Sequence, residues 1–191
     1  MAVYTKINQK EINIINKNFN INKVISFKGI KQGIENTNYL LKSKKKKYIL
    51  TIFEKRVLQK EIPFFMKLMD NLNNSKINCP KPLKTKENKY LIKLKNKTAC
   101  IVSFLEGKDK KILNINDCYA IGKTIARMHV VTNKMKLNRK NSMGIRNLKP
   151  LLESIKFKSK KFSNLKIFLK NNLRDINKNW PRQLPKGIIH G

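Results

Sequence analysis

The sequence predicts an α+β protein in which a strand-rich first half is followed by a helix-rich second half. Up to residue 104, β-branched and aromatic residues gather in short runs separated by turn residues. From Asn116 onward, apolar residues recur at helical spacing instead. We therefore expect two parts, a sheet-based lobe over residues 1–104 and a helical lobe over residues 105–191, joined near Leu105-Glu106-Gly107.

The first half has the composition of a five-stranded sheet with two helices. The helices are expected at Lys10–Phe19 and Gln59–Leu72, with Pro63 in the first turn of the second, where a missing N–H costs little. Turns at Lys44–Lys47 and Lys95–Lys97 predict two hairpins. The expected strands are Val24–Ile30, Thr37–Lys42, Tyr48–Glu54, Tyr90–Leu94 and Thr98–Phe104.

The second half is expected to contain three helices. The first is capped by Asn116 or Asp117, carries apolar residues such as Ile121 and Ile125 on one face, and ends near His129. The others are expected at Leu151–Ile155 and Phe162–Trp180, and the polar stretch Lys134–Asn147 predicts a loop.

The net charge of +33 raises nucleic-acid binding as an alternative function. Only six of the 44 Lys and Arg residues are Arg, however, and the lysines are spread along the whole chain. Lys, Asn and Ile share A/T-rich codons, so a biased genome produces this composition without selection for binding. We expect no specific nucleic-acid partner, although charge alone gives weak binding at low salt.

The three cysteines, Cys79, Cys100 and Cys118, are far apart and show no metal-binding spacing with the two histidines. We expect reduced, structural thiols. No apolar run is long enough for a membrane span or a signal peptide. A cytoplasmic protein without a membrane partner is the prediction.

Two glycines, Gly29 and Gly33, lie in the turn Gly29–Asn38, together with Asn36 and Asn38. Glycine lets backbone N–H groups approach phosphate oxygens, as in the lids that cover nucleotides. An ordinary hairpin explains two glycines about as well. Neither a Rossmann nor a P-loop pattern is present.

Glu61 lies near the start of the second expected helix, and the strand before it contains Thr51 and continues to Lys55. In kinase-like folds, a helical Glu pairs with a strand Lys that contacts the α- and β-phosphates. A kinase is expected to carry that Lys near Thr51, so Lys55 is the nearest substitute. A solvated Glu at a helix N-terminus is the simpler alternative, because carboxylates favour that end.

The apolar segment Ser103-Phe104-Leu105 runs into Gly107 and fits a hinge whose backbone binds adenine; an ordinary strand end is the alternative. His129 suits a helix C-terminus and is expected to be structural. His190 follows an apolar strand-like stretch near the end of the chain. In kinase-like enzymes such a His opens the catalytic loop.

An ordered series of segments along the whole chain resembles the bacterial homoserine kinases of the aminoglycoside-phosphotransferase and choline-kinase type. The segments are Met1–Thr5, Ser26–Ile30 with Gly33, Glu35-Asn36, Asn38–Leu41, Tyr48–Thr51 with Glu54–Val57, Pro63–Phe65 with Leu68-Met69, Cys79–Pro82, Ile101–Gly107, Trp180-Pro181 with Leu184-Pro185, and Gly187–His190. The resemblance implies a protein-kinase-like bilobal fold with an antiparallel nucleotide-binding lobe. It also implies ATP and Mg²⁺ as cofactors and L-homoserine as the substrate that is phosphorylated to O-phosphohomoserine, a step toward threonine.

The same resemblance assigns roles by position. Gly29–Asn38 is expected to cover the phosphates, Glu61 to organise the phosphate site, and Ser103–Leu105 to frame adenine, while Thr51 departs from the superfamily Lys. His190 is expected to open the catalytic loop, whose Asp and metal ligands come after the printed residues. We therefore expect a truncated, inactive chain with a poorly stable second half. The alternative is a non-catalytic remnant that only binds nucleotide.

Overall fold

The computed structural model describes residues 3–54, 57–141, 144–155, 162–181, 183–184 and 187–189. The chain divides into two compact units, Met1–Leu137 with Ile188–Gly191, and Asn138–Gly187. The helix that follows the sheet belongs to the first unit. The functional division near Leu105 therefore stays a prediction, and each compact unit is described by itself.

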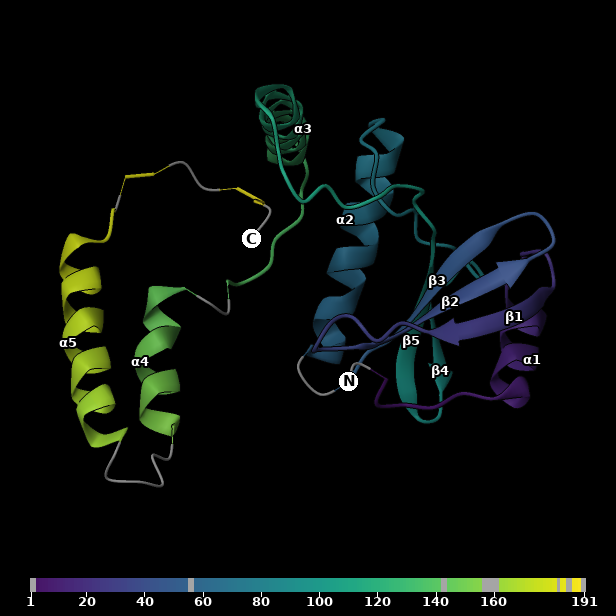
Figure 1. Ribbon diagram of the computed structural model, residues 1–191, viewed down its shortest axis with the longest axis horizontal. Coiled ribbons are helices and arrows are strands. Elements are labelled where there is room, and N and C mark those ends of the chain that lie inside the picture. Colours follow the sequence, from purple (N-terminus) through teal and green to yellow (C-terminus); the bar gives the residue numbers. More distant parts are fainter. Residues whose placement is uncertain are drawn as a thin grey trace. The chain divides into compact units, whose positions relative to one another are not determined.

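Five antiparallel strands form one sheet in the order β1-β2-β3-β5-β4, which confirms the predicted α+β class and strand count (Figure 1). The registers align Tyr39 of β2 with Leu50 of β3, and Leu50 in turn with Ile101 of β5. The strands are β1 (Val24–Gly29), β2 (Thr37–Ser43), β3 (Lys47–Ile52), β4 (Leu91–Leu94) and β5 (Lys97–Ser103).

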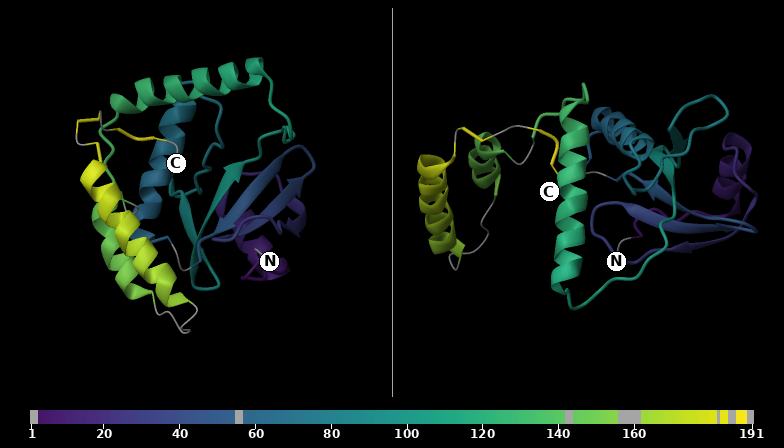
Figure 2. Two further views of the ribbon diagram at one scale, coloured as in Figure 1. Left: turned by 60° about the vertical axis from the view of Figure 1, so that its left-hand side comes forward. Right: turned by 90° about the horizontal axis from the view of Figure 1, so that it is seen from above.

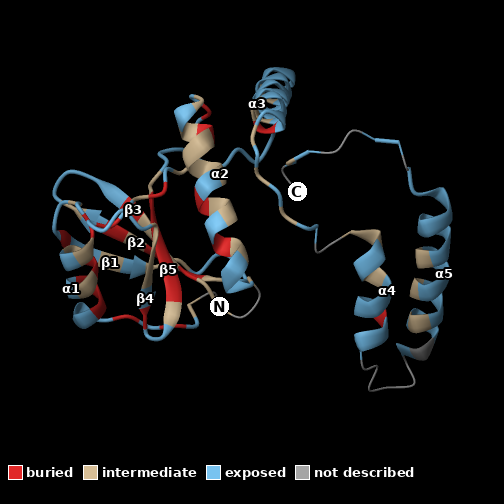
Figure 3. Cartoon of the chain, turned by 180° about the vertical axis from the view of Figure 1, so that it is seen from behind, coloured by how far each residue is buried: buried red, intermediate tan, exposed pale blue. Residues whose placement is uncertain are grey.

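The two faces of this sheet are covered by different helices. Because successive strand side chains alternate between faces, Leu50 and Ile101 pack with Ile12 of α1 (Gln9–Asn18). Their neighbours in sequence pack on the other face against α2 (Ile62–Asn74), which follows the short 3₁₀ helix η1 (Gln59–Glu61). Figure 3 shows buried residues concentrated on the strands and on the sides of α1 and α2 that face them.

Local signals set the ends of these elements. Asn8 and Glu11 form a reciprocal capping box at the start of α1. Lys95 and Asn96 both have positive φ, 48° and 62°, the signature of a two-residue hairpin turn whose twist matches that of the strands. The expected three-residue turn is therefore one residue too long, and Lys97 pairs with Leu94 as the first residue of β5.

The helix after the sheet, α3 (Ile115–Asn133), contacts α2 within the first unit (Figure 2). Its N-cap is Asn114, whose side chain accepts from the Asp117 amide while Asp117 bonds back to the Asn114 amide. The expected cap at Asn116 or Asp117 was wrong by two or three residues, because the capping box needs Asp117 at its third helical position. Thr132 is the buried residue of this helix.

The second unit contains α4 (Ile145–Ser154) and α5 (Ser163–Asn179), which pack against each other. The helix expected at Leu151 begins six residues earlier and contains Pro150. Its apolar residues repeat at helical spacing and Leu152 is buried, so packing favours the longer helix despite the Pro. Among the described residues, no helix combines the length and apolar character needed to cross a membrane.

Candidate functional site

The glycine turn, Gly29–Asn38, connects β1 to β2 and is closed by a 2.9 Å hydrogen bond from the Ile30 amide to the Asn38 carbonyl. A Cβ on Gly29 would lie 2.9 Å from the Val3 Cγ2, so any other residue at this position would force the Val3 side chain to move. Gly33 has φ +97°, a conformation that side chains disfavour. The two glycines therefore serve different needs, close approach at one and backbone conformation at the other.

The N-terminal segment holds this turn in place. The Tyr4 hydroxyl donates to the Ile34 carbonyl at 2.9 Å. The amides of Tyr4 and Thr5 donate to Thr37 Oγ1 at 2.9 and 3.1 Å. The glycine turn is thus fixed from outside by a segment far away in the sequence.

A carboxylate beneath the turn joins these contacts. Glu54 Oε1 accepts from the Thr5 and Thr37 hydroxyls at 2.7 and 2.6 Å, and Oε2 pairs with Lys97 Nζ. Burial raises the pKa of Glu54, but hydrogen bonds from Lys97, Thr37 and Thr5 outweigh it and leave the pKa below the usual 4.5. Glu54 is therefore ionised in the folded protein at neutral pH.

The predicted site residues Asn36, Asn38 and Thr51 lie together at the start of β2 and the end of β3. Asn36 Oδ1 accepts from the Glu54 amide at 3.3 Å, and Asn38 Oδ1 accepts from the Thr51 hydroxyl at 2.8 Å. Asn38 and Thr51 are direct cross-strand partners. Thr51 thus supports the glycine turn through Asn38, a polar role instead of a cationic one.

One face of the sheet stays open beside the turn. Lys28 pairs with Leu40, and Leu40 with Ile49, so the three share the face opposite α1. On this face, α2 packs over β5 at Cys100 and Val102. Leu40 is only half-buried and Lys28 is exposed, so the described residues leave this face partly uncovered near β1 and β2.

Glu61 is half-buried at the junction of η1 and α2, on the helix that covers the other part of this face. Lys55 and His190 lie outside the described residues. The structure therefore brings the glycine turn, Thr51 and the open face together in one region. It does not describe the positions of Lys55 and His190.

The three expected hinge residues differ in how their backbone groups are used. The Ser103 amide donates to the Lys81 carbonyl at 2.9 Å, and the Phe104 amide donates to the Lys47 carbonyl at 3.4 Å. Within the described part of the chain, the Leu105 backbone makes no hydrogen bond, and its side chain is 40% exposed. Of the three residues, Leu105 is the one whose amide and carbonyl are available to a ligand.

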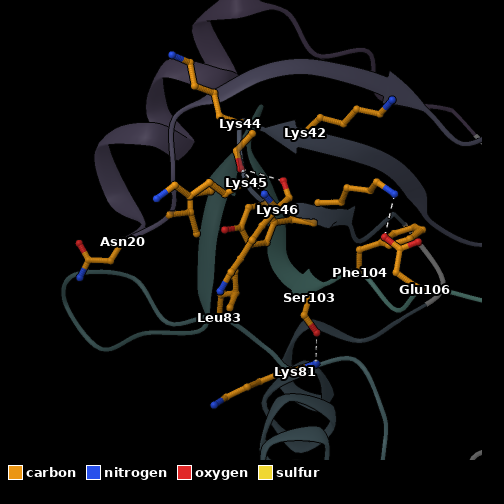
Figure 4. Close-up of a pocket in the computed structure, with 14 residues that line it drawn as sticks. Asn20, Lys42, Lys44, Lys45, Lys46, Lys81, Leu83, Ser103, Phe104 and Glu106 are labelled. Carbon is orange, nitrogen blue, oxygen red and sulfur yellow. Dashed lines mark hydrogen bonds and ion pairs between the residues drawn. The ribbon is translucent and has the colours of Figure 1, made fainter.

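A cavity of about 690 Å³ lies beside this strand end (Figure 4). Lys47 pairs with Glu106 across it at 2.8 Å and lies 5.1 Å from the centre of the Phe104 ring. The cavity is basic and continuous with the hinge. Its lining residues are Asn20, Ile21, Lys42–Tyr48, Lys81, Leu83, Ser103, Phe104 and Glu106.

Metal binding is not provided by the described residues. Among them, no group of three or more His, Cys, Asp or Glu side chains is close enough together to hold a metal ion. The described part of the site therefore lacks a ligand set that fits magnesium by itself.

A five-stranded antiparallel sheet flanked by helices is the architecture of the first lobe of a protein-kinase-like fold. The chain belongs to the phosphotransferase enzyme family, whose family model matches residues 26–191. This confirms the family resemblance seen in the sequence.

Curated relatives named homoserine kinase match the whole chain. The chain is 38% identical to the protein of Paramagnetospirillum magneticum and 35% identical to that of Methylocella silvestris, each over 100% of its length. It covers 59% and 60% of those proteins. The chain thus spans about three fifths of the length of the curated relatives it matches.

Solved structures confirm the fold. A spectinomycin phosphotransferase in complex with ADP and spectinomycin matches with a TM-score of 0.57 and 17% identity, covering 91% of this chain and 56% of that one. A microcompartment-associated aminopropanol kinase matches with a TM-score of 0.58 and 12% identity, covering 75% and 48%. At these identities the likeness establishes the fold alone.

Sequence reasoning missed Glu54 and Lys28 as parts of this region. Glu54 stands out as one of only 11 acidic residues in a strongly basic chain, directly after a strand. Lys28 could have been placed on the open face from the alternation of β1, since Phe27 beside it belongs to the opposite, α1 face.

Proposed function

We propose that this chain provides the nucleotide-binding part of a homoserine kinase, which uses ATP to phosphorylate the hydroxyl of L-homoserine to O-phosphohomoserine. The observation that carries the proposal is the match to homoserine kinases at 38% identity over all 191 residues. ATP and L-homoserine are then the partners of the protein, and magnesium accompanies ATP, as is general for phosphoryl transfer.

The glycine turn covers the phosphates in this proposal. Residues 31–35 are exposed, and glycine in such a turn lets backbone N–H groups approach an anion. Lys28 on the adjoining open face, or Lys55 beyond β3, supplies the positive charge that the superfamily Lys provides in related folds. Glu61 on the neighbouring helix orients that cation, and Thr51 fixes the turn through Asn38.

Adenine binds at the end of β5. The free amide and carbonyl of Leu105 offer one donor and one acceptor in the plane of the strand, the pattern that the edge of an adenine ring complements. Ser103 and Phe104 hold the strand end in place because their own amides are already used by the neighbouring chain segments.

Chemistry at the acceptor hydroxyl requires a base that receives its proton and positions it in line with the γ-phosphate. His190 is proposed to open the loop that carries this base. The expectation that residues 1–191 alone release no ADP stays a prediction.

Two measurements test the proposal. Isothermal titration of the chain with ATP and with GTP is expected to show saturable binding that favours ATP, because the hinge recognises the base. A gene that encodes these 191 residues within a chain of the relatives' full length is expected to restore growth of a bacterial threonine auxotroph lacking homoserine kinase. The same strain challenged with spectinomycin serves as the control for the acceptor.

The outcomes separate the alternatives. If the chain binds no ATP, the proposed nucleotide site is wrong. Protection against spectinomycin without growth in the absence of threonine would replace homoserine with a different acceptor. Release of ADP by residues 1–191 on addition of homoserine would contradict the expected inactivity of the chain but strengthen the assignment of substrate.

A further inference from the structure

We propose that Glu54 is a positioning residue that holds the glycine turn in its nucleotide-binding shape without touching the nucleotide. The inference rests on the proposed nucleotide site and extends it to a buried group on the opposite side of the sheet. Two separate lines of contact connect this carboxylate to the turn.

The first line runs through the backbone next to Glu54. Its own amide donates to the Asn36 side chain at 3.3 Å. Asn36 is the last residue of the turn before β2 begins at Thr37. A shift of Glu54 is therefore transmitted to the C-terminal end of the glycine turn.

The second line runs through a hydroxyl group. Thr37 Oγ1 donates its single proton to Glu54 at 2.6 Å and accepts from the amides of Tyr4 and Thr5. A hydroxyl has one donor and two acceptor positions, so all three are used here. Tyr4 then reaches the middle of the turn through its bond to the Ile34 carbonyl at 2.9 Å.

A carboxylate suits this position better than a neutral group. Being an acceptor only, it forces the hydroxyls of Thr5 and Thr37 to donate, which leaves the Thr37 lone pairs facing the backbone amides. Lys97 neutralises the charge and also donates to the Thr5 hydroxyl at 2.8 Å. A glutamine would have an NH2 group in place of one carboxylate oxygen. That donor would face either the donating hydroxyls of Thr5 and Thr37 or the ammonium group of Lys97.

Burial and position exclude direct contact with a ligand. The Glu54 side chain is 9% exposed, and Thr37 is fully buried. Thr37 alternates with Asn38, so it lies on the α1 face while Asn38 faces the nucleotide side. A charged side chain this deep is uncommon unless it is fully paired, as it is here.

The test compares Glu54→Gln with two control variants. Ile52→Val, two residues earlier on the same face, shortens a buried core side chain opposite Thr37 but leaves every hydrogen bond of the turn in place. Glu87→Gln makes the same chemical change at an exposed ion pair with Lys89. Each variant is measured for melting temperature, for ATP affinity by titration, and for hydrogen exchange of residues 29–38 without nucleotide.

Glu54→Gln is expected to speed exchange across residues 29–38 and weaken ATP binding, each by about tenfold, the scale of one lost hydrogen bond to a charged group. Ile52→Val is expected to lower the melting temperature while ATP affinity stays within about twofold, because the turn keeps its contacts. Glu87→Gln is expected to change neither property.

Equal loss of ATP affinity in Ile52→Val at a matched melting temperature would overturn the proposal, as would unchanged exchange of the turn in Glu54→Gln. If Glu54→Gln does not fold, Thr5→Val removes one partner and is expected to give the same pattern. If the unchanged chain binds no ATP, the proposed function fails, while faster exchange confined to residues 29–38 still supports positioning.

Discussion

The sheet with α1 and α2 contrasts with the helices α3, α4 and α5 in how each region uses its apolar residues. In the sheet region, Leu50, Ile52 and Ile101 are completely buried. On α3, the large apolar residues Ile115 and Tyr119 are 88% and 69% exposed. The helices α1 and α3 both begin with a complete capping box, so for these two the difference lies in tertiary partners.

This contrast shows that an amphipathic pattern and a good cap form a helix without giving it a core. The α3 helix has a complete capping box, yet Thr132 is its buried residue. Most of the stability of a helix in a protein comes from packing of its apolar face. We therefore expect the sheet region to carry most of the free energy of unfolding.

The largest effect is expected in the core of the sheet. Ile101→Ala is predicted to lower the free energy of unfolding by about 2–5 kcal/mol, because it leaves a cavity between β3, β5 and α1. Ile125→Ala on α3, where the side chain is 37% exposed, is expected to cost under about 0.5 kcal/mol. Urea denaturation followed by circular dichroism compares the two, and similar losses would contradict the contrast.

A smaller, pH-dependent effect is expected at Glu54. Glu54→Gln is predicted to cost about 1–3 kcal/mol at neutral pH, since it leaves Lys97 without its charged partner. Because the folded-state pKa of Glu54 lies below 4.5, the contribution is complete above about pH 4.5 and is lost as the pH falls through the lowered pKa. Unfolding curves from pH 7 to pH 3 are expected to converge, and a constant difference would contradict the ion pair.

The two capping boxes allow a direct test of the contrast with a single chemical change. Asn8→Ala is expected to destabilise the whole sheet region by about 1 kcal/mol, because α1 is part of its core. Asn114→Ala is expected to fray α3 without changing the main unfolding transition. Hydrogen exchange resolves the two regions, and a shift of the main transition by Asn114→Ala would show that α3 unfolds together with the sheet.

The smallest effect on stability is expected at Lys28. Lys28→Ala is predicted to leave the melting temperature unchanged, because the side chain is exposed, and to weaken ATP binding about tenfold through loss of one phosphate contact. Lys17→Ala, at an exposed site on α1, is the matched control for charge. Equal weakening by both variants would indicate a general effect of charge.

Much of the sheet region could be predicted from the sequence, because its signals are local. Glycines, turn residues and alternating apolar residues located all five strands, and the helical spacing located α1 and α2. The hairpin at Lys95 and Asn96 was predicted one residue too long, because positive φ at both positions is a property of the backbone that the side chains indicate only weakly.

The expected site residues came from the glycines of the turn and from positions that match the family motifs, and their roles stay predictions. Gly29 and Gly33 were identified because glycine is selected for close approach or positive φ. Glu54 was missed because its partners Thr5, Thr37 and Lys97 come from three distant segments. The hinge was predicted at three residues, and the structure leaves the backbone of Leu105 available.

The sequence by itself determined most of the secondary structure, the α+β class and the family, because these follow from residue periodicity, turn chemistry and an ordered set of motifs. Only the tertiary structure decided which face of the sheet is open, which carboxylate supports the glycine turn, and which apolar helix faces are buried. The physical reason is that burial and hydrogen bonding depend on the distance between groups in space. Folding brings Thr5 and Lys97 into hydrogen-bond contact although they are 92 residues apart in the sequence.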